Sequence, residues 1–298
     1  MRMTRTLSAS LLALALAACT TNTPLSSTST DAPRSLAGAV SAADPRAQAA
    51  GEEMLARGGS ATDAAIAVML ALGVVEPQSS GIGGGGFMVR GTADGSVGTF
   101  DGRETAPASA TPDWFLDENG QLPPFIESVR SGLSVGVPGN IALAAKAHAA
   151  YGKLPWASLF EPAIKLASQG FEMNPRLNGM LESARNRSAH SAQARSIFFD
   201  AEGQPLPVGT VVRNEQLAQT LETIARGGRA AFYSGDTARA IATTVASDTP
   251  HTDAMTYGDV TSYDAKARDA VCGSYREYRV CTMGPPTSGG VAVLQMLG

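Results

Sequence analysis

The apolar positions of the chain recur mainly at helical spacing, and strand-like patterns are confined to two regions. Helical periodicity bounded by start and stop signals predicts helices over residues 44–57 and 64–75. Short apolar runs at 87–90 and 97–101 flank Asp94-Gly95, a hairpin turn signal. Further helices are expected over 138–151, 155–169, 175–187, 214–226 and 237–247, followed by strands within 267–283. The pattern predicts a mixed α and β fold with most helices between two strand regions.

A glycine-rich run at 81–86 separates the second predicted helix from the first predicted strand. Gly81, Gly83 and Gly86 satisfy the spacing G-x-G-x-x-G, but a dinucleotide-binding fold places a strand before these glycines and a helix after them. Because the predicted order is the reverse, we do not expect a nucleotide site. Residues without bulk at these positions instead predict a place where two backbone segments approach closely.

The first residues have the pattern of an export signal. Arg2 and Arg5 precede a 12-residue apolar run at 7–18 that is too short to span a bilayer as a helix. The run ends in Leu16-Ala-Ala-Cys19, which resembles the lipobox of bacterial lipoproteins, so Cys19 is predicted to become the lipid-bearing first residue. The alternative is an ordinary export signal in which the cysteine is incidental.

Three segments follow from this pattern: a signal at 1–18, a lipidated and Ser/Thr/Pro-rich tether at 19–37, and a folded region at 38–298. The tether composition cannot bury enough apolar surface to fold. We therefore expect an exported protein, held by a lipid anchor in the periplasm or cell envelope.

Composition narrows the possible functions. The 298 residues are 44% hydrophobic and 17% charged, which is typical of a globular chain. A net charge of −4 and only four lysines leave no basic surface for neutralising phosphates, so a nucleic-acid partner is not expected. His148, His190 and His251 have no metal-ligand spacing, and no nucleophile elbow is present. We expect neither a metal site nor a cofactor.

Cys272 and Cys281 are the two cysteines that remain after Cys19. A hairpin turn centred on Arg276 and Glu277 would place them directly opposite each other, close enough for a disulfide. Export to an oxidising compartment favours the bridge over a metal site. The alternative is a pair of reduced, packed thiols.

Arg103 is the candidate ligand-binding residue. It lies in Asp101-Gly-Arg-Glu-Thr-Ala-Pro107 at the end of the second predicted strand, where loops commonly carry function. A planar guanidinium can clamp a substrate carboxylate with two parallel hydrogen bonds. An arginine flanked by acids is, however, more often a structural ion pair, and the local pattern alone leaves both interpretations open.

Several motifs together resemble the large subunit of γ-glutamyltranspeptidase. The similarity runs from about residue 36 to 298, and the 76–88 stretch is the most specific part. The matching segments are, in chain order, Gly58-Gly59, 61–65, 72–88, 101–107, 135–139, Pro155-Trp156, Tyr263 with its neighbours, and 285–290.

The resemblance implies an α+β fold of the N-terminal-nucleophile hydrolase type, a four-layer αββα sandwich that is incomplete in this chain. It implies a proenzyme that cuts itself into two subunits, after which an N-terminal Thr of the small subunit attacks the γ-glutamyl amide. Glutathione and other γ-glutamyl compounds would be donors, and water, amino acids or dipeptides would be acceptors. By the same resemblance, Arg103 corresponds to the arginine that binds the substrate α-carboxylate.

The sequence also departs from the family pattern. The threonine-rich cleavage motif lies beyond the family's Pro-Pro-x-Ser-Gly-Gly landmark, and an apolar helical pattern at 289–298 reaches the last residue. Thr243-Thr244 lies inside a predicted helix and is rejected as the nucleophile. We therefore expect no catalytic residue among these residues, a chain truncated at its C-terminus, and no activity without the small subunit. The alternatives are a cephalosporin or glutaryl acylase, a poly-γ-glutamate depolymerase, or a non-catalytic surface lipoprotein.

Overall fold

The computed structural model describes residues 38–249 and 254–298. The predicted signal, the tether, Cys19 and His251 lie outside these ranges. Within them, the predicted mixture of helices and strands is confirmed, and the elements follow the expected order. None of the helices in the two ranges combines the length and apolar character needed to cross a bilayer.

Two helices at the start of the described region form one side of the hydrophobic core. Helix α1 (Pro45–Ala56) ends before Gly58, which has a φ of +84°. Helix α2 (Ala61–Val75) begins with a capping box, in which Ser60 and Asp63 each accept a hydrogen bond from the other's backbone N–H. Helix α2 has few polar residues and is buried against α1, α4 (Asn140–Tyr151) and α5 (Glu161–Gln169).

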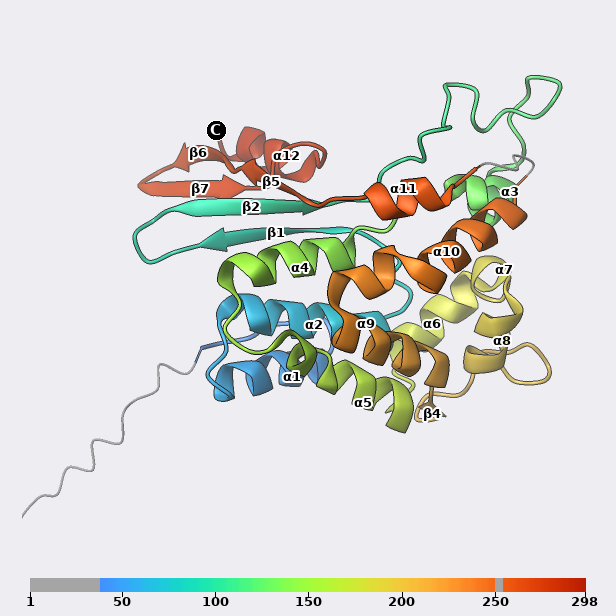
Figure 1. Cartoon of the computed structure of the whole chain (residues 1–298), viewed down its shortest axis with the longest axis horizontal. Coiled ribbons are helices and arrows are strands. Elements are labelled where there is room, and N and C mark those ends of the chain that lie inside the picture. The colour runs from blue at the N-terminus through green and yellow to red at the C-terminus, as the bar shows by residue number, and fades with distance from the viewer. Residues whose placement is uncertain (1–37, 250–253) are drawn as a thin grey trace, which may run out of the picture. The chain divides into compact units, whose positions relative to one another are not determined.

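A three-stranded antiparallel sheet lies next to this helical core. Strands β1 (Gly86–Gly91) and β2 (Val97–Gly102) form the predicted hairpin, and β5 (Lys266–Asp269) adds to the other edge of β2. The register pairs Thr99 with Arg268. Helix α4 packs against β1 and β2, so the sheet, α4 and α2 follow one another as layers (Figure 1). The sheet thereby brings residues near 100 and 266 together.

The middle of the chain is helical and departs from the predicted boundaries in three places. The expected helix at 155–169 is a 3₁₀ turn (Trp156–Leu159) followed by α5, because Pro162 is tolerated only in a first turn. The expected helix at 175–187 divides into α6 (Pro175–Ser183) and α7 (Arg185–Ser188). Helix α9 (Glu215–Tyr233) runs past Arg226 through a kink at Gly228, whose φ is +63°.

Other elements carry too little apolar periodicity to have been predicted. They are α3 (Phe125–Arg130), a 3₁₀ turn (Gly132–Ser134), β3 (Phe171–Glu172), α8 (Ala192–Phe198), β4 (Val211–Val212) and α11 (Tyr257–Ser262). Helix α10 (Gly235–Ser247) contains Thr243 and Thr244, as predicted.

The last elements form a second hairpin covered by a helix. Strands β6 (Val271–Tyr275) and β7 (Tyr278–Thr282) pair only with each other, and α12 (Gly289–Leu297) packs on both. Cys272 lies directly opposite Cys281, which confirms the predicted register. The structure joins the two by a disulfide, with their Cα atoms 4.1 Å apart.

Candidate substrate-binding site at Arg103

Arg103 begins the loop that follows β2. Its side chain is 58% exposed, and its Nε lies 3.5 Å from Glu104 Oε2. Ion pairs at this exposure contribute little to stability, because water screens them and both side chains must be ordered. The guanidinium is therefore loosely held by its own neighbour and is accessible to a ligand.

The backbone of Arg103, in contrast, is held at both ends. Its N–H donates to Asp101 Oδ1 at 2.9 Å, and its carbonyl oxygen accepts from the Tyr263 hydroxyl at 2.7 Å. Asp101 is buried, and its other carboxylate oxygen accepts from Arg268 Nε at 2.7 Å. Residues from β2 and from the 263–268 segment thus fix the peptide groups on either side of an exposed arginine.

Tyr263 is itself rigidly placed. Its ring stacks on Tyr233 with centroids 5.8 Å apart and an interplanar angle of 11°, and Arg229 donates to its carbonyl oxygen. Burial, together with the nearby carboxylates of Asp101, Glu104 and Asp264, raises the pKa of Tyr263 to about 12. The phenol therefore remains a neutral hydrogen-bond donor throughout the physiological pH range.

The glycine-rich run 81–86 crosses this loop at close range. Gly84 accepts hydrogen bonds from the backbone N–H groups of Gly139 at 2.9 Å and Asn140 at 3.0 Å, and Asn140 Nδ2 donates to Gly81 O at 2.7 Å. A Cβ atom on Gly85 would lie 2.5 Å from both Gly102 O and Glu104 Oε2. The predicted close approach of backbone segments is confirmed, and it occurs beside Arg103.

Comparison with known proteins now identifies the family. A model of the γ-glutamyltranspeptidase family matches residues 47–298. The chain belongs to the γ-glutamyltranspeptidase family. The glutathione hydrolase proenzyme of Bacillus subtilis is 40% identical over 263 residues, which cover 87% of this chain and 44% of the relative. The corresponding Escherichia coli proenzyme is 38% identical over 264 residues, or 89% of this chain and 45% of the relative.

Solved structures agree with this family assignment. The Helicobacter pylori γ-glutamyltranspeptidase has a TM-score of 0.82 at 36% identity and covers 88% of this chain and 74% of its own. The Bacillus anthracis transpeptidase enzyme CapD has a TM-score of 0.72 at 35% identity, over 87% and 80% of the two chains. These neighbours confirm the predicted α+β fold of the N-terminal-nucleophile hydrolase type. The chain spans less than half the length of the curated relatives it matches.

Within the γ-glutamyltranspeptidase fold, the glycine run and His148 can also be placed. Helix α2 ends at Val75 and β1 begins at Gly86, so the glycine run follows a helix, the reverse of a dinucleotide site. His148 Nε2 lies 2.8 Å from Leu154 O. Across residues 38–249 and 254–298, no three His, Cys, Asp or Glu side chains are grouped so that they could hold a metal ion.

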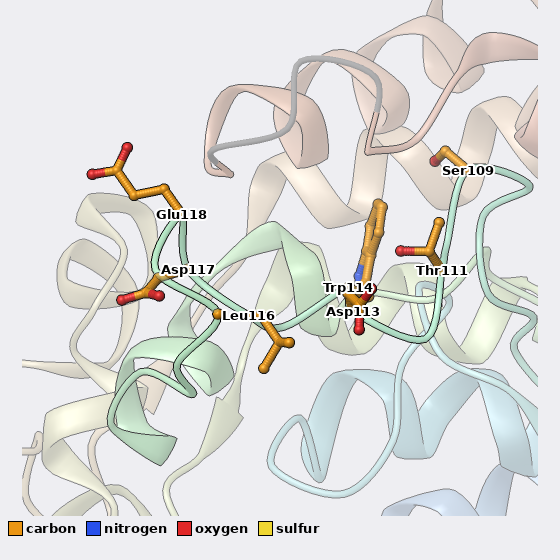
Figure 2. A pocket seen from close by; sticks show the side chains of 8 residues that line it. Ser109, Thr111, Asp113, Trp114, Leu116, Asp117 and Glu118 are labelled. Atoms are coloured by element: carbon orange, nitrogen blue, oxygen red, sulfur yellow. The ribbon is translucent and has the colours of Figure 1, made fainter.

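A cavity on the 109–120 segment does not include Arg103 among its lining residues. This cavity has a volume of about 590 Å³. In Figure 2, Asp117 and Glu118 lie at one end of it and Ser109 and Thr111 at the other. Asp117 Oδ1 already accepts from the N–H groups of Asn119 and Gln121, at 2.9 and 2.8 Å. This carboxylate stabilises its own turn.

Three contributors to the Arg103 site were missed from the local pattern: Asn140, Tyr263 and Arg268. Asn140 follows Pro138-Gly139 at the start of a predicted helix, and a polar residue there suggested only a helix start. Tyr263 appeared only as a landmark of the family resemblance. A tyrosine that follows a short helix carries no local signal that its hydroxyl reaches a residue 160 positions earlier.

Proposed function

We propose that this chain is the large-subunit portion of a γ-glutamyltranspeptidase proenzyme that transfers the γ-glutamyl group of glutathione and related compounds to water, amino acids or dipeptides. The observation that carries the proposal is the exposed Arg103 guanidinium on a backbone fixed by Asp101 and Tyr263. The relatives named glutathione hydrolase, at 38 to 40% identity, support it.

In the proposed reaction, the hydroxyl of a threonine at the new N-terminus of the small subunit attacks the γ-amide carbonyl. The amine leaves with a proton, and water or an acceptor amine then displaces the threonine from the acyl-enzyme. Arg103 binds the donor's α-carboxylate through paired hydrogen bonds, which orients the γ-carbonyl for attack.

Substituting Arg103 tests the proposal in the full-length proenzyme. Arg103→Ala removes hydrogen bonds between charged groups that contribute roughly 1.5–3 kcal/mol, so the KM for L-γ-glutamyl-p-nitroanilide should rise about 10- to 100-fold. Self-cleavage, followed by gel electrophoresis, should be unchanged because it breaks a peptide bond of the precursor and needs no γ-glutamyl donor. Arg226→Ala, at a 70% exposed arginine on α9, is the matched control. An unchanged KM in Arg103→Ala would contradict the assignment.

The acylase alternative also has structural support. A cephalosporin acylase from Bacillus halodurans has a TM-score of 0.67 at 30% identity, and covers 79% of this chain and 44% of its own. Glutaryl-p-nitroanilide keeps the terminal carboxylate of the γ-glutamyl substrate and lacks only its α-amino group, so a γ-glutamyltranspeptidase should turn over the γ-glutamyl compound much faster than the glutaryl one. Equal turnover of both compounds would favour the acylase. A full-length chain that neither cleaves itself nor hydrolyses either compound would favour the non-catalytic lipoprotein.

We also propose that the protein is exported and lipid-anchored through Cys19, with the small subunit of the same precursor as its partner. The lipobox-like residues Leu16 to Cys19 and the Ser/Thr/Pro-rich tether support the anchor. Cys19→Ser should move the full-length protein from the detergent phase to the aqueous phase in Triton X-114 partitioning. If the native protein and Cys19→Ser are both recovered in the aqueous phase, Cys19 carries no lipid and the first residues are an ordinary export signal.

A further inference from the structure

We propose that the 263–268 segment positions Arg103 for substrate binding, through the Tyr263 hydroxyl on one side and Arg268 with Asp101 on the other. This inference rests on the proposed function of Arg103. Tyr263 and Arg268 are positioning residues in it, because both act on the peptide groups next to Arg103. Of these three residues, only Arg103 contacts the donor.

The geometry makes the segment a two-point support. Tyr263 donates to the Arg103 carbonyl at 2.7 Å, and Arg268 donates to Asp101 Oδ2, while Asp101 Oδ1 accepts the Arg103 N–H at 2.9 Å. Both supporting side chains are themselves held. The Tyr263 ring stacks on Tyr233, and Arg268 lies in β5, paired with β2. The two supporting side chains are therefore fixed to the sheet and to the helical core.

The rest of the loop offers Arg103 little other restraint. Gly102 precedes it, and Gly85 and Gly136, which have no side chains, approach the adjacent residues Gly102 and Glu104. Its ion pair with Glu104 is long and exposed. The direction of the Arg103 side chain consequently depends on the orientation of its Cα–Cβ bond, and the two backbone hydrogen bonds determine that orientation.

Loss of one support should weaken donor binding without slowing the chemistry. The α-carboxylate is remote from the scissile amide, and a contact made equally in the ground state and transition state changes KM and leaves kcat unchanged. A neutral hydrogen bond of this kind contributes a net free energy that corresponds to roughly a three- to tenfold change in affinity. The expected signature is a raised KM for the γ-glutamyl donor with unchanged kcat and self-cleavage.

Tyr263→Phe in the full-length protein removes the hydroxyl and keeps the ring stacked on Tyr233. We expect the KM for L-γ-glutamyl-p-nitroanilide to rise about three- to tenfold. Tyr278→Phe, at a 63% exposed tyrosine on β7, is the matched control and should leave KM unchanged. Arg268→Gln tests the second support and should also raise KM with kcat unchanged.

Double variants separate positioning from a general structural effect. If Tyr263 and Arg268 act through Arg103, then Tyr263→Phe or Arg268→Gln should add no further rise in KM to Arg103→Ala. Multiplying effects, or a fall in kcat, would overturn the inference. If the Tyr263→Phe variant does not cleave itself, the inference is still tested by the KM of Arg268→Gln, alone and combined with Arg103→Ala.

A failure of the positioning role can be distinguished from a failure of the proposed function of Arg103. If Arg103→Ala raises KM and neither support variant does, the positioning role is wrong and the proposed function stands. If Arg103→Ala itself leaves KM unchanged, the proposed function of Arg103 is wrong, and the positioning role falls with it.

Discussion

The Arg103 loop and the β6–β7 hairpin both lie at strand ends, but they are held in opposite ways. The Arg103 loop is held by residues 160 and 167 positions away from their partners, Tyr263 on Arg103 and Arg268 on Asp101. The hairpin is held by pairing within 271–282 and by a disulfide with a sequence separation of 9. One region depends on the completed fold, and the other depends on its own sequence.

This difference determines how each region should respond to damage. Long-range hydrogen bonds form only after distant segments have been brought together at a cost in chain entropy. A single misplaced atom at their junction therefore affects the whole core. A short hairpin closed by a disulfide can weaken locally while the remaining structure stays intact.

The largest effect is expected when one carbon atom is added where the segments around Gly102, Gly139 and Tyr263 cross. In Gly139→Ala, the new Cβ would collide with Gly102 O and the Tyr263 hydroxyl. We expect the full-length protein to lose about 2–4 kcal/mol of unfolding free energy, because overpacking must displace backbone. Urea denaturation measures this loss.

Gly91→Ala is the matched control for this substitution. Gly91 ends β1, and a Cβ there would meet no atom within 4 Å. A change within about 0.5 kcal/mol is expected, as for ordinary surface substitutions. Similar losses at Gly139 and Gly91 would show that the crossing is not tightly packed.

A second long-range junction, at Asp63, should respond to pH. Its buried carboxylate accepts from the backbone N–H groups of Ser60 at 2.8 Å, Lys153 at 2.9 Å and Leu154 at 3.2 Å. Burial raises the pKa of Asp63, but these hydrogen bonds outweigh burial and leave the pKa below the usual 3.8. Asp63→Asn keeps an acceptor and removes the charge, so it should cost about 1–2 kcal/mol at neutral pH.

The sign of the pH dependence follows from the lowered pKa. The contribution of the Asp63 charge is fully present above pH 3.8, and it is lost as the pH falls through the lower folded-state value. The stability difference between the native protein and Asp63→Asn should therefore shrink below pH 3.8. The fully exposed Asp236 provides a control in Asp236→Asn. A difference that stays constant on acidification would contradict the role of the charge.

The most local effect is expected at the hairpin. Replacing Cys272 and Cys281 together by serine reopens a short loop, and we expect a local loss of about 2 kcal/mol, near the lower end of the range for disulfides. Amide hydrogen exchange should accelerate in 271–282 and remain unchanged at 101–105. Acceleration in both regions would show that the two are coupled.

The oxidation state can be measured directly. In the native protein, intact mass should increase by two hydrogens after reduction if Cys272 and Cys281 are bonded, as the structure has them. An unchanged mass would favour the pair of reduced thiols.

Local patterns were sufficient for much of the fold. The turns at Asp94-Gly95 and Arg276-Glu277 were both predicted. The capping box at Ser60 and Asp63 lies just before the predicted helix at 64–75. Each of these features depends on residues within a few positions of one another. Helix boundaries were less accurate where a proline or a glycine interrupts a helical pattern, as at Pro162 and Gly228.

Local sequence patterns predicted only part of the candidate site. Arg103 was found because its surroundings resemble a known family, since an arginine between acids has several ordinary explanations. Neither the buried state of Asp101 nor the reach of Tyr263 is encoded in neighbouring residues. Helical and strand periodicity says which face of an element is apolar, and leaves open which distant hydroxyl approaches its backbone.

The sequence by itself determined the hairpin register that places Cys272 opposite Cys281, the bounds of several helices, and the close glycine crossing, because these depend on local backbone preferences and side-chain size. Tertiary structure alone decided that β5 adds to β2 and that the 263–268 segment supports Arg103. Such contacts form when burial of the shared core brings distant segments together, and no local preference specifies which segments meet.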